Sequence, residues 1–270
     1  MKKAALFFLT ALSCASILSG CKAKTEKIDL STIHTTAAES SRETMAQPTA
    51  ETKAPGESKT EPAKETSQAK PAIKAEISKY TSGQVTVEYP VLSNLNDTEL
   101  EKKVNAMLKD NALSFLKANK LDEAKTTMNV KCQVISIDRK RMTAVYTGSY
   151  HTQDAPESVN LFYTNTLDLN KCENLGFNDY SDAYTMAGYV LSGDCTFYNV
   201  DASREQKLME YKNTHDIDYY TDLFNKADFG NSEGFPESFS YENRGVVYFS
   251  IPVSHELGDY ALIKFNTESK

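Results

Sequence analysis

Apolar and polar residues are arranged in three different ways along the chain. A short apolar run covers residues 4–17, a polar stretch without periodic apolar positions covers residues 22–78, and regular apolar patterns begin near Tyr80. Periodic patterns indicate packed elements, whereas a segment without them buries too little apolar surface to offset its ordering entropy. We therefore predict one folded domain over residues 79–270, preceded by a disordered linker over residues 21–78.

Within the predicted domain, apolar and polar residues alternate with period two in several segments, which is typical of half-buried strands. These segments are residues 84–89, 128–137, 142–151, 158–169, 237–242, 246–251 and 260–265. Short polar connections join the second, third and fourth of them, which favours an antiparallel meander. Asn243, Arg244 and Gly245 form a predicted tight turn between the fifth and sixth.

Helical spacing of apolar residues appears in three further segments. They are residues 97–118, 179–191 and 201–227, and the last has an expected break near Asn213. Because strands and helices occur in separate blocks, the sequence predicts an α+β fold in which helices pack on an antiparallel sheet.

The first 20 residues have the segments of a bacterial lipoprotein signal peptide in their usual order. Lys2 and Lys3 precede the apolar run, which is shorter than the roughly 20 residues of a membrane-spanning helix. The run ends in Leu18-Ser19-Gly20-Cys21, which resembles a lipobox. We expect cleavage between Gly20 and Cys21, lipidation of Cys21, and anchoring at the extracytoplasmic face of the cytoplasmic membrane. An ordinary secretory signal with an incidental cysteine is the alternative.

The predicted linker is rich in Thr, Ala, Glu, Lys and Pro. Between residues 22 and 79 it has ten Lys and Arg against nine Asp and Glu, so it is not a polybasic membrane patch. We interpret it as a spacer, and its length suits a thick-walled Gram-positive cell.

The predicted domain is acidic. Residues 80–270 contain 18 Lys and Arg against 28 Asp and Glu, a net charge of −10. Such a charge repels phosphate, which argues against nucleic acid as a partner. It permits a basic partner, although acidity also serves solubility alone.

Three cysteines lie in the domain, at Cys132, Cys172 and Cys195. Cys132 lies in an alternating apolar run and is interpreted as a small buried residue. Cys172 and Cys195 could form a disulfide, because an extracytoplasmic location permits one. The spacing of the cysteines and histidines does not predict a zinc site.

No segment has the pattern of a known catalytic or metal-binding motif. His255-Glu256-Leu257-Gly258-Asp259 lacks the second histidine of a zinc protease, and Asp216, Asp218 and Asp222 fit a calcium loop poorly. We predict no catalytic residue, no cofactor and no metal. The 15 tyrosines, without any tryptophan, are either half-buried strand residues, the preferred interpretation, or contact residues for a ligand.

Several segments together resemble the extracellular domain of the RsiV family of lysozyme-sensing anti-sigma factors. A similar domain of unknown function precedes the catalytic domain of some peptidoglycan deacetylases. The segments are Val87-Glu88-Tyr89-Pro90 before a helix with Asn105, Val134-Ile135-Ser136 paired with Gly148-Ser149-Tyr150, Asn165-Thr166-Leu167-Asp168-Leu169 before Leu175-Gly176-Phe177-Asn178-Asp179-Tyr180, and the hairpin and strand from Ser238-Phe239 to Phe265. The resemblance implies a binding module of the cell envelope. A lipobox stands here in place of the transmembrane helix, and no deacetylase domain follows.

These observations lead to one expectation and two alternatives. We expect a membrane-anchored, non-enzymatic lipoprotein that binds or senses a lysozyme-like protein or peptidoglycan. The alternatives are a wall-modifying hydrolase with a site assembled from distant residues, and a structural spacer or assembly partner. A pocket containing two carboxylates, or a histidine with a carboxylate, would favour the hydrolase.

Overall fold

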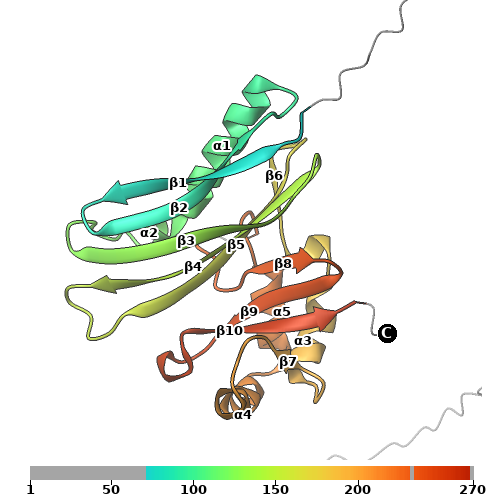
Figure 1. The fold of residues 1–270 in the computed structure, drawn as a ribbon. Helices are drawn as coiled ribbons and strands as arrows, with labels where there is room; N and C mark the ends of the chain where they lie inside the picture. The colour runs from blue at the N-terminus through green and yellow to red at the C-terminus, as the bar shows by residue number, and fades with distance from the viewer. Residues whose placement is uncertain (1–70, 232–233, 268–270) are drawn as a thin grey trace, which may run out of the picture. The chain divides into compact units, whose positions relative to one another are not determined.

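The computed structural model describes residues 71–231 and 234–267. In this part the chain forms a six-stranded sheet, a four-stranded sheet and five α-helices (Figure 1). The predicted signal peptide and nearly all of the predicted linker lie outside the described residues. In the described part, no helix is long and apolar enough to cross a membrane.

The six-stranded sheet has its strands in sequence order, from β1 to β6. They are β1 (Lys74–Ser82), β2 (Val85–Ser93), β3 (Thr126–Ile137), β4 (Arg141–Thr152), β5 (Val159–Asp168) and β6 (Glu173–Leu175). All neighbours are antiparallel except β2 and β3, which are parallel. The expected meander is confirmed for β3, β4 and β5.

The parallel pair follows from the crossover between its strands. Helices α1 (Thr98–Ala112) and α2 (Ser114–Ala118) carry the chain from β2 to β3. The side chain of Asn105 on α1 pairs with the backbone of Leu92, accepting from its N–H at 2.7 Å and donating to its carbonyl at 2.9 Å. Only Val85–Val87 of β2 pair with β3. Farther along β2, the Asn105 side chain takes the place of a neighbouring strand for the backbone of Leu92.

The four-stranded sheet is antiparallel and has the order β7, β10, β9, β8. Its strands are β7 (Thr196–Phe197), β8 (Ser240–Asn243), β9 (Val246–Pro252) and β10 (Tyr260–Asn266). The associated helices are α3 (Ala183–Leu191), α4 (Ala202–Tyr211) and α5 (Ile217–Asn225), with the 3-10 turns η1 (Phe177–Asp179), η2 (Lys212–Thr214) and η3 (His255–Leu257). The expected break near Asn213 is confirmed, because η2 separates α4 from α5.

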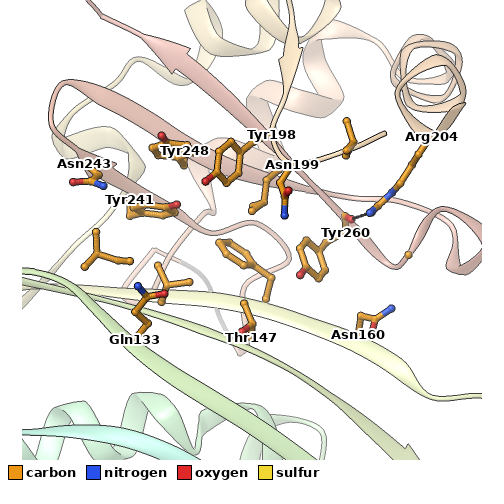
Figure 2. Close-up of a pocket in the computed structure, with 16 residues that line it drawn as sticks. Gln133, Thr147, Asn160, Tyr198, Asn199, Arg204, Tyr241, Asn243, Tyr248 and Tyr260 are labelled. Carbon is orange, nitrogen blue, oxygen red and sulfur yellow. Dashed lines mark hydrogen bonds between the residues drawn. The ribbon is translucent and has the colours of Figure 1, made fainter. Parts of the chain in front are cut away.

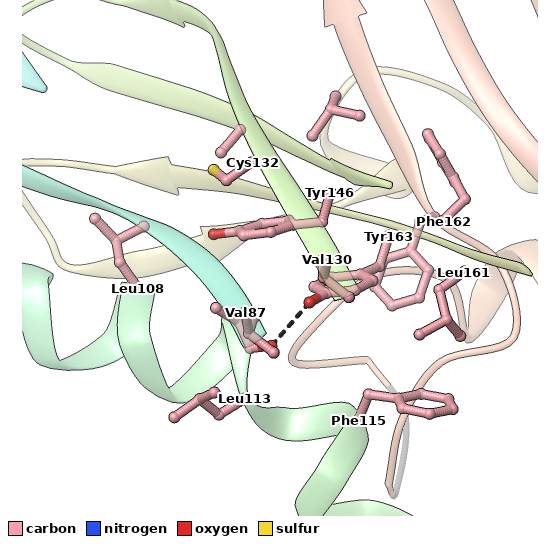
Figure 3. Packing of buried hydrophobic residues seen from close by; sticks show 14 of the residues in the cluster. Val87, Leu108, Leu113, Phe115, Val130, Cys132, Tyr146, Leu161, Phe162 and Tyr163 are labelled. Atoms are coloured by element: carbon pink, nitrogen blue, oxygen red, sulfur yellow. Dashed lines mark hydrogen bonds between the residues drawn. The ribbon is translucent and has the colours of Figure 1, made fainter. Parts of the chain in front are cut away.

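Each sheet has its own hydrophobic core. The first core contains Tyr146 stacked on Tyr163 with ring centroids 4.6 Å apart, between α1 and the six-stranded sheet, and it extends to Phe239 and Tyr241 at the smaller sheet (Figure 3). The Tyr163 hydroxyl donates to the carbonyl of Ala112 at 2.8 Å, so the sheet is fixed to the end of α1. The second core packs α3, α4 and α5 against the four-stranded sheet and includes Phe224 and Phe249.

The α+β fold class is confirmed, and two details differ from the prediction. The chain forms two sheets rather than one, and the larger sheet is mixed. Strand β1 begins at Lys74, so residues 74–78 of the predicted linker belong to the sheet. Its sequence does not predict a strand because few of its residues are apolar, and its strand structure depends on pairing with β2 over its full length.

Candidate functional site

A groove of about 660 Å³ lies between the two sheets (Figure 2). One side is formed by β3, β4 and β5, and the other by β8, β9, β10 and the connection from β7 to α4. The aromatic and polar residues of the lining are Gln133, Thr147, Asn160, Phe162, Tyr198, Asn199, Arg204, Tyr241, Asn243, Tyr248 and Tyr260.

The groove exists because each sheet buries one face against helices and directs the other face toward its neighbour. Successive side chains of a strand point to opposite faces. On β5, Tyr163 therefore points toward α1, while Phe162, which is also buried, points to the opposite face and borders the groove. On β9, Phe249 enters the second core while Tyr248 lines the groove.

Aromatic rings form much of the lining. Tyr241 and Tyr248 stack with centroids 4.8 Å apart and planes 9° apart, and Tyr198 meets Tyr248 edge to face at 5.0 Å. Phe162 and Tyr260 form a second stacked pair at 5.3 Å. Tyr198 is 41% exposed, unusually open for a large ring. The groove thus offers rigid aromatic surfaces to a ligand.

Polar groups in the lining are largely without protein partners. In the described part of the chain, the amides of Gln133, Asn199 and Asn243 and the hydroxyls of Tyr198 and Tyr248 make no hydrogen bond to another protein group. A side-chain amide has both donors and an acceptor, and a hydroxyl has one donor and an acceptor. These groups are free to bind a ligand with many hydroxyl or amide groups.

Arg204 is the charged residue of the lining. It lies in the first turn of α4, where its backbone N–H donates to Asp201 at 2.9 Å, and its Nη2 donates to the carbonyl of Tyr260 at 2.9 Å. Its Nε is buried, and neither this atom nor the guanidinium as a whole has a carboxylate partner within the described residues. Gly258 makes room for it, because a Cβ there would lie 2.9 Å from Nη2.

His255 lies near one end of the groove but does not line it. Its Nε2 is 2.6 Å from Glu157 Oε2, and its Nδ1 is 2.8 Å from Asp259 Oδ1. The hydrogen bond and charge of Asp259, followed by those of Glu157, raise the pKa of His255. Because carboxylates occupy both ring nitrogens, neither is open to a ligand. The same Asp259 accepts from the backbone N–H of Asn160 at 2.7 Å, which joins β5 to the connection between β9 and β10.

A buried carboxyl group joins the two sheets. Asp228, 3% exposed, accepts hydrogen bonds from the N–H and hydroxyl of Ser240, and its Oδ1 is 3.2 Å from the hydroxyl of Thr164 on β5. Burial raises the pKa of Asp228 to about 7, against the opposing effect of these hydrogen bonds. The Tyr180 hydroxyl lies 2.5 Å from the Ser240 hydroxyl and completes the network.

The possible disulfide between Cys172 and Cys195 is not formed in the structure. Both have free thiols, as does Cys132. Cys172 packs against the first core and Cys195 lies within the second, so they are held in separate clusters. Burial raises the pKa of Cys132 to about 12 and that of Cys195 to about 11, which opposes a nucleophilic thiolate.

Other predicted positions have structural roles or lie outside the described residues. Gly20 and Cys21 are outside them, so cleavage and lipidation stay predictions. Asp216 caps α5 by accepting from the N–H of Tyr219, and Asp222 pairs with Lys226 at 2.6 Å. Among the described residues, no group of three or more His, Cys, Asp or Glu side chains is placed to hold a metal ion.

The sequence alone does not indicate the groove. Its lining comes from strands far apart in the chain, and no local motif connects them. The tyrosine content was the available signal, because Tyr198, Tyr241, Tyr248 and Tyr260 all line the groove.

No established protein-family profile and no curated protein matches the sequence. Among solved structures, the chain is similar to a DUF3298 family member from Bacteroides fragilis, with 12% identity, a TM-score of 0.43, and coverage of 73% of this chain and 90% of that one. It is also similar to a DUF3298 family protein from Pseudomonas aeruginosa, with 8% identity, a TM-score of 0.34, and coverage of 74% and 92%.

Proposed function

We propose that this protein is a lipid-anchored binding protein of the bacterial cell envelope whose groove binds a glycan. The observation that carries the proposal is the lining of the groove, in which four tyrosines stand beside amides that lack protein partners in the described part. The volume of about 660 Å³ falls in the roughly 300–1,000 Å³ range of ligand sites.

The chemistry of a sugar ring matches this lining. A pyranose has flat patches of C–H groups on its faces and hydroxyl groups around its edge. Aromatic side chains provide broad, rigid contact surfaces for such patches. Amides such as Asn199 and Asn243 can donate to and accept from the hydroxyls. Peptidoglycan, an expected ligand from the sequence, has a glycan of this type.

The composition of the lining favours binding over hydrolysis. Most glycosidases use two carboxyl groups that flank the scissile bond. No Asp, Glu, His or Cys is part of the groove lining among the described residues. The histidine with carboxylates that would have favoured a hydrolase is present at His255, but Glu157 and Asp259 occupy its ring nitrogens.

A basic protein such as lysozyme is the second candidate ligand. It is favoured by the net charge of −10 over residues 80–270. Attraction that depends on net charge alone weakens as salt screens it. The same charge disfavours nucleic acid.

Anchoring through Cys21 is a separate part of the proposal. Two or three acyl chains make membrane attachment nearly permanent. Replacing Cys21→Ala should move the protein from the membrane to the soluble fraction. Unchanged membrane association of this variant would contradict the anchor.

The test of glycan binding is calorimetry with the full chain in mild detergent near physiological salt. The probes are chitotetraose, a peptide-free tetrasaccharide of alternating N-acetylglucosamine and N-acetylmuramic acid, and lysozyme. We expect saturable binding of at least one saccharide, and about tenfold weaker binding with Tyr198→Ala.

Tyr184→Ala provides the matched control. Tyr184 lies on α3 outside the groove lining and is 61% exposed, so both substitutions remove an exposed tyrosine. Binding of lysozyme but of neither saccharide would replace the glycan with a protein ligand. An equal loss of saccharide affinity in Tyr198→Ala and Tyr184→Ala would overturn the proposal, and so would a lack of binding to every probe.

A further inference from the structure

The end of the groove that contains Arg204 has a different chemistry from the rest of the lining. Figure 2 shows Arg204, Tyr260 and Asn160 at this end, while Tyr241 and Asn243 lie at the other. We propose that the bound glycan has a carboxylate on one of its sugar residues and that Arg204 binds this carboxylate. The inference rests on the proposed glycan binding and names the chemical class of the glycan.

Arg204 forms no ion pair among the described residues, and the neighbouring Asp201 caps the helix by accepting from the Arg204 backbone N–H. The carboxylates closest along the same strands and connections are engaged elsewhere. Asp259 binds His255 through Oδ1 and Asn160 through Oδ2, and Glu242 pairs with Arg141 at 2.8 Å. In the described part of the chain, no carboxylate lies within ion-pair distance of Arg204.

The guanidinium is held in a fixed place with part of its hydrogen-bonding capacity unused. Nη2 donates to the carbonyl of Tyr260, while Nε is buried without a partner. A guanidinium has five N–H donors, and a poorly paired cation that is partly removed from water is costly. A carboxylate in the groove would offset this cost with charge-assisted hydrogen bonds.

The surroundings of Arg204 suit a sugar acid. Tyr260 is half-buried, stacks on the buried Phe162, and provides apolar surface for the ring that bears the carboxylate. Gly258 lacks the side chain that would crowd the guanidinium. The arrangement therefore places a charged contact next to an aromatic one, as a carboxylated pyranose requires.

The experiment compares saccharides of equal length with and without carboxylates. Calorimetry with the full chain measures chitotetraose, which is neutral, and the peptide-free tetrasaccharide whose muramic residues carry lactyl carboxylates. The dipeptide L-alanyl-D-glutamate is the third probe, because peptide stems are the other source of carboxylates in peptidoglycan. The variants are Arg204→Gln and Arg204→Lys, with Lys207→Gln as a control on the exposed side of the same helix.

We expect the wild-type chain to prefer the carboxylated tetrasaccharide about tenfold. Arg204→Gln should abolish this preference, because it should weaken binding of the carboxylated tetrasaccharide about tenfold more than binding of chitotetraose. Arg204→Lys should retain part of the preference, since it keeps the charge without the planar geometry. Lys207→Gln should behave as wild type.

Other outcomes separate the two proposals. Equal binding of the two saccharides by the wild-type chain would overturn the carboxylate subsite and leave glycan binding intact. An equal loss of both saccharides in both Arg204 variants would show that Arg204 only supports the structure. Tight binding of the dipeptide without a preference between the saccharides would assign the carboxylate to peptide. Binding of no probe would overturn the proposed function together with the subsite.

Discussion

Asp228 and Ser240 are joined by a 2.8 Å hydrogen bond from the Ser240 N–H to the Asp228 carboxyl group, inside the protein where β5 approaches β8. Thr164 of β5 uses its hydroxyl proton to donate to the Ser240 carbonyl at 2.6 Å. The same hydroxyl lies 3.2 Å from Oδ1 of Asp228, whose pKa burial raises to about 7. This network connects the two sheets that form the groove.

Asp228 should make the protein less stable as the pH rises from about 4 to 7. An aspartate in an unfolded chain has a pKa of about 3.9, and the folded value is about 7. The folded state therefore binds the proton more tightly across this window, and the stabilisation is complete below about pH 4 and lost as pH rises through 7. We expect this contribution to be roughly 2–4 kcal/mol.

Chemical denaturation at pH 5 and pH 8 measures how the free energy of unfolding changes with pH. The Asp228→Asn variant should lose this part of the pH dependence, whereas Asp222→Asn, which changes an exposed acid on α5, should keep it. The same slope in Asp228→Asn as in the wild type would contradict the assignment.

His255 should titrate above its ordinary value of 6.5, because Asp259 and Glu157 stabilise the charged ring. The charged ring therefore pairs with both carboxylates and joins the β4–β5 and β9–β10 connections at lower pH. The stabilisation from these ion pairs is lost as the pH rises through the raised pKa. Proton NMR of the ring should show a lower midpoint in Asp259→Asn and a smaller decrease in Glu157→Gln. Glu256→Gln serves as the control, and a midpoint that all three variants share with the wild type would rule out the link.

Gly148 cannot accept a side chain. A Cβ at this position would lie 2.1 Å from the Asn129 carbonyl oxygen and 2.8 Å from the Cα of Val130, both backbone atoms of β3. Gly148→Ala should therefore separate β4 from β3 and destabilise the protein by about 3 kcal/mol. Gly188→Ala, in open space on α3, should instead stabilise it by about 0.5–1 kcal/mol. Thermal unfolding of the two variants should shift in opposite directions, and equal shifts would refute the clash.

Lys212 closes the end of α3 from inside the second core. It is 2% exposed, and its Nζ donates to the carbonyls of Val190 at 2.7 Å and Ser192 at 2.8 Å. Lys212→Met should leave these carbonyls unsatisfied and lower the free energy of unfolding by about 2 kcal/mol. Lys226→Met removes an exposed lysine just after α5 and should change the free energy of unfolding by less than about 0.5 kcal/mol. Hydrogen exchange at the end of α3 should rise in the first variant only.

Local periodicity was enough to predict β3, β4, β5 and the three helices of the second half, because each of them buries a regular set of side chains. It could not predict β1, whose apolar positions Ala75 and Ile77 are separated by charged and polar residues. Nor could it predict that β2 and β3 are parallel, since this follows from the path of the chain through α1.

The candidate site was less predictable than the fold for a related reason. Tyr198 and Tyr248 are 50 positions apart in the sequence and meet through the pairing of β7, β10 and β9. Arg204 gains its place from the carbonyl of Tyr260 and the space left by Gly258. None of these relationships has a local sequence pattern, so the sequence could indicate an abundance of tyrosine but not where the tyrosines gather.

Strand β1 has a mechanical consequence. On the proposed anchoring, the lipid end of the chain enters the domain at Lys74, and β1 is an edge strand held to β2 by nine residue pairs. A wall polymer bound in the groove and a lipid anchored in the membrane would pull in opposite directions on the β1–β2 pair. The nine residue pairs of the β1–β2 ladder would then be the first part of the domain to carry this tension.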